Sequence, residues 1–350
     1  MAHSAGDPPG GTATATAPPP AEEEHRESLG LRIQHLLHAH SILGPLAVLL
    51  VSIIVFSILS DRFLLPSNIS LVLQQVTVVA VLGIGQTIII LTAGIDLSNG
   101  AIMVLSSIVM AKLSAEAGVP GVLALLLGFV VGTLCGLLNG LLVTRLHLPP
   151  FIVTLGTLFI FFSLNLYISG SATIRGRDMA PLLLWTGNTF TVAGARITYG
   201  SIIMLILFGI FAYALRQTAW GKHVYATGDD SEAARLAGIR TDRVLLSVYS
   251  TAGFMYAIAA WTLIGRIAAA SPQAGQNDNL NSITAVVLGG TSLFGGRGSI
   301  IGTLIGALIV GVFRNGLVLV GVQDLWQDFA VGVLVIAAVS IDQWIRKVKA

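Results

Sequence analysis

Residues 121–143 read GVLALLLGFVVGTLCGLLNGLLV, an apolar run that holds no charged side chain. A helix of roughly 20 apolar residues matches the ~30 Å hydrocarbon core of a bilayer. Glycine recurs at every fourth position of the run, at Gly128, Gly132, Gly136 and Gly140. In lipid, helices associate through such faces, because small residues let two backbones approach closely. The run therefore predicts a membrane-spanning helix that packs tightly along its glycine face.

The rest of the chain has the same apolar character. Its 350 residues are 54% hydrophobic and 10% charged, whereas a soluble domain carries about 25% charged residues. The mean hydropathy is +0.85. Apolar stretches predict about ten spans, at residues 42–60, 69–93, 99–115, 121–143, 150–169, 200–216, 244–264, 283–296, 299–320 and 325–342. The stretch 283–296 is short and broken by glycines, so a partly re-entrant element is an alternative there. The expected fold class is an all-α membrane protein, a polytopic bundle of about ten transmembrane helices with broken helices.

Three regions are expected along the chain. Residues 1–40 form a cytoplasmic tail that is disordered where it is low in complexity, followed by an amphipathic lead-in along the membrane surface. Residues 41–345 form the transmembrane domain, and 217–243 is a hydrophilic loop within it. Lys and Arg are more frequent in the segments on the side of the termini, which places both termini in the cytoplasm. The chain is thus expected to be a multi-pass protein of the cytoplasmic membrane.

Several classes of protein and site are excluded by what the sequence lacks. The net charge of +2 comes without a contiguous basic patch, which argues against a nucleic-acid partner. The lone Cys135 excludes an internal disulfide and a cysteine-based metal site. The clustered histidines at 35, 38 and 40 have no acidic or cysteine neighbour, so a solvated segment is favoured over a metal site. No G-x-x-x-x-G-K-[ST] loop occurs, so any ATP that energises the protein binds another polypeptide.

Two polar features interrupt the apolar pattern. Asp96 lies in the break between the second and third spans, where it either caps the third helix or serves a functional site at membrane depth. The loop 217–243 contains a short helix that Ser231 is expected to cap and Gly238 to end. This helix is either an ordinary surface helix or a docking element for a partner. The candidate docking residues are Asp229, Asp230, Glu232, Ala233, Ala234, Arg235, Ala237 and Gly238.

Five segments carry a resemblance to a known family. They are AGIDLS at 93–98, LNG at 138–140, PPFIVTLGT at 149–157, EAARLAGI at 232–239 and the glycine-rich stretch 285–302. In this order they resemble the ribose-type (monosaccharide) ABC importer permease family, over residues 42–342. The resemblance implies a transport subunit that moves a pentose or hexose across the membrane and has no catalytic residue, metal or cofactor of its own. It implies three protein partners: an ATPase subunit bound through the loop helix as a cytoplasmic coupling helix, an extracytoplasmic sugar-binding protein, and a second permease copy of the same or another chain.

A neutral sugar needs a pathway lined by uncharged polar groups. The candidate pathway residues are Gln74, Gln75, Gln86, Asn139, Thr154, Thr157 and Asn165, with Phe151 and Phe294 to pack on the apolar face of the sugar. Each polar candidate has an alternative role in a hydrogen bond between helices. Two other functions remain open: an ABC permease for nucleosides or branched-chain amino acids, and a secondary carrier that works alone. The carrier is disfavoured because the spans lack a series of acidic groups that could relay protons.

Overall fold

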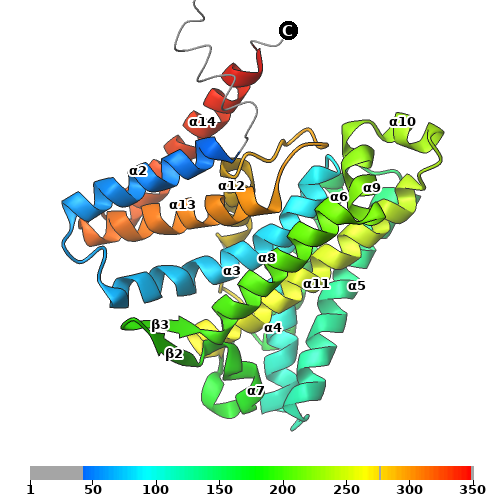
Figure 1. Cartoon of the computed structure of the whole chain (residues 1–350). Helices are drawn as coiled ribbons and strands as arrows, with labels where there is room; N and C mark the ends of the chain where they lie inside the picture. The colour runs from blue at the N-terminus through cyan, green and yellow to red at the C-terminus, as the bar shows by residue number, and fades with distance from the viewer. Residues whose placement is uncertain (1–41, 276, 348–350) are drawn as a thin grey trace, which may run out of the picture.

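The computed structural model describes residues 42–275 and 277–347, so the expected tail, lead-in and histidine cluster lie outside the described residues. The described chain is mostly helical (Figure 1). Its helices are α2 (Leu43–Leu59), α3 (Pro66–Leu91), α4 (Asn99–Ala115), α5 (Gly121–Arg145), α6 (Pro150–Ser169), α7 (Pro181–Leu184), α8 (Tyr199–Gln217), α9 (Ala219–Asp229), α10 (Ser231–Leu236), α11 (Thr241–Ile267), α12 (Asp278–Leu288), α13 (Ile300–Leu319) and α14 (Asp324–Lys347). Its short strands are β1 (Ile174–Arg175), β2 (Thr189–Val192), β3 (Ala195–Thr198) and β4 (Ala269–Ala270).

The predicted polytopic helical membrane fold is confirmed. Among the described residues, six helices are long and apolar enough to cross a bilayer, namely α3, α5, α6, α8, α11 and α13. The apolar helices α2 and α4 have 17 residues each and are slightly shorter. Apolar side chains such as Leu126, Phe159 and Ile210 remain exposed on α5, α6 and α8, as expected of helices that face lipid.

The span expected at 283–296 differs from prediction. Here α12 covers 11 residues and ends at Leu288, so at 1.5 Å per residue its length is about 16 Å, well short of a membrane crossing. An irregular segment at 289–298 follows, in which Gly290, Gly295 and Gly296 have φ values of +82°, +84° and +67°. Glycine adopts this left-handed conformation without steric cost, and it stops the helix. The element is therefore a short helix followed by irregular backbone, and not a continuous helical span.

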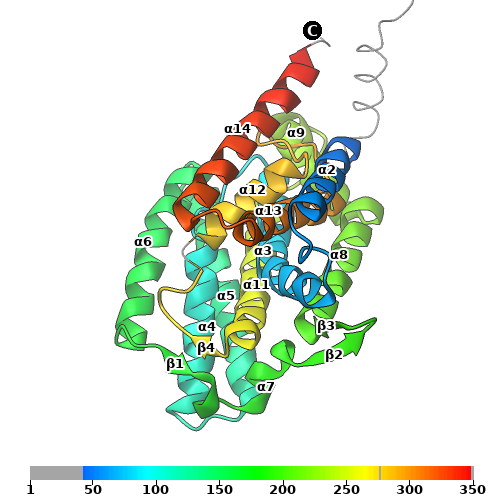
Figure 2. The same ribbon diagram turned by 90° about the vertical axis from the view of Figure 1, so that its left-hand side faces the viewer.

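Helix α11 runs through the centre of the bundle, where α3, α4 and α5 pack against it (Figure 1). Figure 2 shows α4 and α6 on one flank and α2 and α8 on the other, with α3, α12 and α13 between them. The short helix α10 lies at one end of the bundle, and the β2–β3 hairpin and α7 lie at the other. We call these the α10 end and the hairpin end.

The glycine stripe of α5 lies against α11 and α4. A Cβ built at Gly132 would lie 2.6 Å from the carbonyl oxygen of Gly253, and one at Gly140 would lie 3.0 Å from the Cβ of Tyr249. At Gly128 the added atom would meet the side chain of Met110 on α4. Only glycine leaves room for these contacts, so the stripe sets the spacing of the three helices.

The hairpin end is built from the segment between α6 and α8. Strands β2 and β3 pair antiparallel, with Thr189 opposite Thr198 and Val192 opposite Ala195. The two residues of the turn, Ala193 and Gly194, have positive φ values of +49° and +82°. A two-residue hairpin of this kind twists in the same sense as its strands, which makes it a stable cap on the bundle.

Candidate functional site

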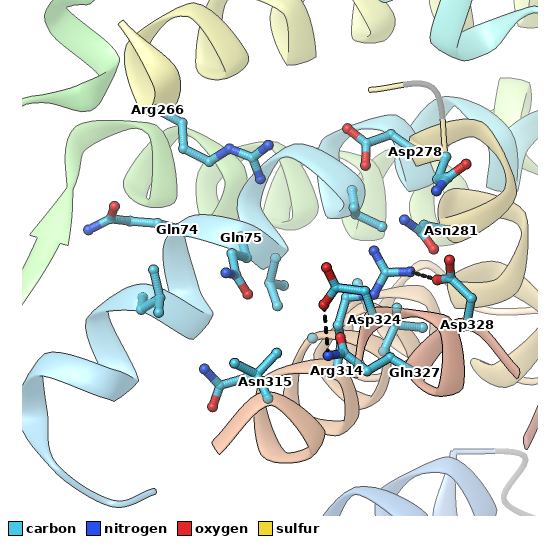
Figure 3. A pocket seen from close by; sticks show the side chains of 18 of the residues that line it. Gln74, Gln75, Arg266, Asp278, Asn281, Arg314, Asn315, Asp324, Gln327 and Asp328 are labelled. Atoms are coloured by element: carbon cyan, nitrogen blue, oxygen red, sulfur yellow. Dashed lines mark hydrogen bonds and ion pairs between the residues drawn. The ribbon is translucent and has the colours of Figure 1, made fainter. Parts of the chain in front are cut away.

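A cavity of about 670 Å³ lies between α3, α11, α12, α13 and α14, toward the hairpin end (Figure 3). Its volume falls within the usual range for ligand pockets, about 300–1,000 Å³. Its polar lining consists of Gln74, Gln75, Arg266, Asn277, Asp278, Asn281, Arg314, Asn315, Asp324, Gln327 and Asp328. Aliphatic side chains such as Val76 and Val310 fill the remaining wall. The cavity therefore combines polar and aliphatic side chains in an open hollow of a largely apolar bundle.

Part of the polar lining is fixed by contacts within the wall. The Arg314 guanidinium donates to the Asp328 carboxylate at 2.6 Å, and Gln327 donates to Asp324 at 3.0 Å, as Figure 3 shows. Asn315 exchanges two hydrogen bonds of 2.9 Å with Asn68 at the start of α3. The Arg314 and Asn315 pairs join α13 to α14 and α3, and the Gln327 pair lies within α14.

Other lining groups are available to a solute. Within the described residues, the side chains of Gln75, Arg266 and Asn281 make no hydrogen bond or ion pair, and they face the cavity from three different helices (Figure 3). Amides supply both donors and acceptors, whereas the guanidinium supplies donors only. Such a set can bind several hydroxyl groups of a polyol at once. None of the described residues in the lining has an aromatic ring, so they would hold a solute by hydrogen bonds without stacking.

The predicted pathway residues lie in five different places. Gln74 and Gln75 line the cavity, and Asn165 lines a second, smaller one of about 260 Å³ between α4 and α6. Phe151 is half exposed on α6, and Phe294 is 82% exposed at the α10 end. The remaining candidates, Gln86, Asn139, Thr154 and Thr157, are buried within the bundle, outside both cavities.

The buried candidates surround the break between α3 and α4. Asp96 is fully buried, and its carboxylate accepts hydrogen bonds from the backbone N–H of Ser98 at 2.7 Å and from the Ser98 hydroxyl at 2.6 Å. Asn139 on α5 donates to that hydroxyl at 2.9 Å, and Thr154 on α6 donates to the carbonyl of Ile95 at 2.9 Å. Together these bonds hold the non-helical backbone of the break, which lipid could not solvate.

The loop helix of the sequence analysis is α10, and its cap differs from the predicted one. The Asp230 carboxylate, not Ser231, accepts from the backbone N–H groups of Glu232 and Ala233, at 2.9 Å each. A carboxylate also suits the positive N-terminal end of a helix better than a hydroxyl does. The expected end is found at Gly238, which has φ +90°. The helix is thus a short element with a defined start and end at the surface.

The two faces of α10 have different surroundings. Ala234 is only 5% exposed and faces the bundle, so it does not contribute to an outer docking face. Leu236 is 84% exposed, and Asp229, Ala233, Arg235 and Ala237 are exposed beside it. The outward face of α10 therefore carries one large apolar side chain among charged and small ones.

Helix α9 connects α10 to the bundle through hydrogen bonds of its aromatic residues. The Trp220 indole donates to the Ser247 hydroxyl of α11 at 2.8 Å. The Tyr225 hydroxyl donates to the Gly298 carbonyl at 2.9 Å, and burial raises the pKa of this hydroxyl, so it stays protonated and able to donate. Helices α9 and α10 are therefore attached to both α11 and the segment that precedes α13.

Comparison with known proteins assigns the family. Residues 68–339 match the family model described as branched-chain amino acid transport system / permease component. The chain belongs to this permease family. The permease is 50% identical over 332 residues to a fructose import permease of Rhizobium meliloti, a match that covers 94% of this chain and 92% of the relative. It is 41% identical to a ribose import permease of Bacillus subtilis, with 86% and 92% covered, and 36% identical to one of Escherichia coli K12, with 85% and 92% covered.

Family membership confirms the predicted class of protein. The permease is the membrane-embedded transport subunit of an ABC importer and not an enzyme, and it is a multi-pass protein of the inner membrane. Such a permease implies an ATPase subunit and a binding protein as partners. The ATP-binding site is therefore expected on the ATPase partner.

Several lining residues of the cavity were not among the candidates predicted from the sequence. Arg266 and Arg314 lie near the ends of α11 and α13, and Asp278, Asp324 and Asp328 lie on α12 and α14. One signal was present, since an arginine within the apolar run 299–320 is costly in a membrane and often functional. Asp328 within the apolar run 325–342 gave the same signal, whereas Asp278 and Asp324 gave none, because they precede the predicted spans.

Proposed function

We propose that the permease carries a neutral monosaccharide through the cavity between α3, α11, α12, α13 and α14. The observation that carries the proposal is the lining itself, which presents unpaired amide and guanidinium groups from three helices inside a membrane-embedded bundle. A path for solutes must bind them strongly enough to admit them and weakly enough to release them. Hydrogen bonds to a polyol without an aromatic platform satisfy both conditions.

The relatives favour a sugar as the substrate. The similar permeases reported above are named for fructose and ribose, and the fructose permease shares half of all aligned residues with this chain. Fructose is accordingly the first candidate and ribose the second. A branched-chain amino acid is the alternative, because the family description names it and because the cavity contains arginines and aspartates that suit a zwitterion.

The proposed topology has ten crossings, with the α10 end in the cytoplasm. Helices α2, α3, α4, α5, α6, α8, α11, α13 and α14 supply nine, and α12 with the segment 289–298 supplies the remaining one. In support, Asp278 lines the cavity toward the hairpin end, whereas Gly296 lies against Asp229 of α9 at the α10 end. The cavity then opens on the extracytoplasmic half, where a binding protein delivers the sugar, and both termini are cytoplasmic.

The α10 helix is the proposed coupling helix. It is capped, exposed and attached through α9 to α11, so a partner bound to it can move the bundle. Its partner-facing residues are Glu232, Ala233, Arg235 and Ala237 with Leu236, while Asp230 and Gly238 shape the helix and Ala234 anchors it. A second permease copy, identical or related, completes the membrane unit.

The test is uptake into proteoliposomes that contain the permease with its ATPase subunit, in the presence of its binding protein. Labelled fructose, ribose and leucine are compared, and ATP-dependent uptake of a sugar in preference to leucine is expected. Replacing Gln75 or Asn281 by Leu removes hydrogen bonds to the solute, each worth about 1–1.5 kcal/mol, so uptake should fall roughly tenfold per variant. Gln217→Leu, which changes an exposed glutamine at the end of α8, is the matched control. Uptake of leucine alone, or unchanged uptake in both cavity variants, contradicts the proposal.

A further inference from the structure

The segment 289–298, GGTSLFGGRG, forms a well-defined structure that we call the glycine turn. The Ser292 N–H donates to the carbonyl of Arg297 at 2.8 Å, and the Gly295 N–H donates to the carbonyl of Ser292 at 3.1 Å. The Ser292 hydroxyl accepts from the N–H of Phe294 at 3.3 Å. These bonds close the turn upon itself and fix the backbone at its tip.

The side chain at the tip is Phe294, which is 82% exposed. At the α10 end, among the residues that the structure describes, Leu236 is a large apolar side chain of similar exposure, at 84%. In the proposed topology this end faces the cytoplasm, where an exposed aromatic ring gains nothing from lipid. An aromatic ring on a rigid turn is a typical anchor residue in protein interfaces, because it buries a large area with little loss of entropy.

The glycine turn lies directly against the end of α9, where α10 begins. A Cβ built at Gly295 would lie 2.5 Å from the carbonyl oxygen of Gly228, and one at Gly296 would lie 2.7 Å from the Cα of Asp229. Asp229 directly precedes Asp230, the residue that caps α10. The backbones of the turn and of the α9–α10 junction are therefore in direct contact, and Phe294 stands beside the coupling helix.

The same turn is bonded to the helices that line the cavity. The Gly296 N–H donates to the carbonyl of Leu91, the last residue of α3, at 3.0 Å. Two residues after the turn, α13 begins at Ile300. Helices α3 and α13 carry Gln75 and Arg314 in the cavity wall. A force on the glycine turn is thus applied directly to two of the five helices around the cavity.

We propose that Phe294 is a second anchor for the ATPase subunit, beside Leu236 of α10, and that the glycine turn transmits the movement of that subunit to α3 and α13. The proposal rests on the proposed function insofar as it places the α10 end in the cytoplasm. It gives the ATPase an apolar contact on each side of the α9–α10 junction, so the matching surface of that subunit should be a cleft with apolar walls. Phe294 then acts in docking, outside the substrate pathway.

The first experiment measures binding of the ATPase subunit to the purified full-length permease. Phe294→Ala should weaken that binding about tenfold, the effect typical of a removed interface anchor, and Leu236→Ala should act in the same direction. Phe159→Ala is the matched control, because Phe159 is also exposed but lies on the lipid-facing side of α6. Yield and thermal stability should stay at the wild-type level in all three variants, since these side chains pack on little within the chain.

The second experiment identifies the neighbour of the ring directly. A photoreactive benzoylphenylalanine at position 294 of the assembled complex should crosslink to the ATPase subunit, whereas one at position 159 should crosslink to lipid. Crosslinks from 294 to lipid alone or to the second permease copy, or binding by Phe294→Ala within twofold of wild type, overturn the proposal. Neither readout depends on sugar uptake, so a wild-type complex that imports no sugar would contradict the proposed function while leaving this inference standing.

Discussion

Replacing Gly136 by Ala should destabilise the bundle, although alanine is the better helix former. A Cβ at this position would meet the carbonyl oxygen of Tyr249 and would lie 3.0 Å from both the Cα and the N of Gly253. These are backbone atoms of α11, which cannot rotate away as a side chain can. The added methyl group can be accommodated only if α5 and α11 move apart, and contacts along the whole glycine stripe then loosen.

The expected size of the effect follows from two opposing terms. Overpacking of a tight interface costs about 1–3 kcal/mol, and contacts with backbone on the far side place Gly136→Ala near the upper value. The change from Gly to Ala within a helix stabilises it by about 1 kcal/mol, so the free energy of unfolding should fall by about 2 kcal/mol in total. Gly209 on α8 is the matched control, because no atom lies within 4 Å of a Cβ built there. Gly209→Ala should only gain the helix stabilisation of about 1 kcal/mol. The free energies of unfolding of the two variants should therefore differ by about 3 kcal/mol.

The assay is thermal unfolding of the purified permease in detergent, followed by the monodisperse fraction in size-exclusion chromatography. At roughly 2 °C per kcal/mol, the difference should separate the two midpoints by about 6 °C, with Gly136→Ala below wild type and Gly209→Ala at or above it. The reasoning is refuted if Gly136→Ala melts at the same temperature as Gly209→Ala or higher, because the stripe would then carry no close packing.

Three further predictions concern topology, the break between α3 and α4, and the wall of the cavity. After replacement of the native cysteine by alanine, an impermeant thiol reagent outside intact cells should label Thr191→Cys on the hairpin but not Glu232→Cys on α10. Labelling of the α10 site alone would show that the protein has the opposite orientation in the membrane. Asp96→Asn keeps an oxygen that accepts from the backbone N–H and should cost less than about 1 kcal/mol, whereas Asp96→Ala should cost about 1–3 kcal/mol; equal melting temperatures would contradict this. In a double-mutant cycle to alanine, Asn68 and Asn315 should show a coupling free energy of about 1 kcal/mol, and additive effects would mean that their paired hydrogen bonds contribute no stability.

The membrane class and the helices could be predicted from sequence because hydropathy and periodicity are local properties. A run of about 20 apolar residues forms a helix in lipid, since only a helix satisfies the backbone hydrogen bonds within the run itself. The end of α10 could also be predicted locally, because glycine at position 238 readily adopts the φ of +90° that ends the helix. The four-residue spacing in α5 likewise placed its glycines on one face, whatever helix lies opposite.

The short α12, the Asp230 cap and the positions of the polar candidates depended on the tertiary structure. Gln86 and Gln75 are both glutamines in α3, yet one is buried among other side chains and the other lines the cavity. A polar side chain within a span needs a partner, and a neighbouring helix or a chamber meets that need equally well. Which of the two it finds depends on which helices pack around it. The cavity brings together residues from Gln74 to Asp328, so its lining exists only once α3, α11, α12, α13 and α14 have assembled.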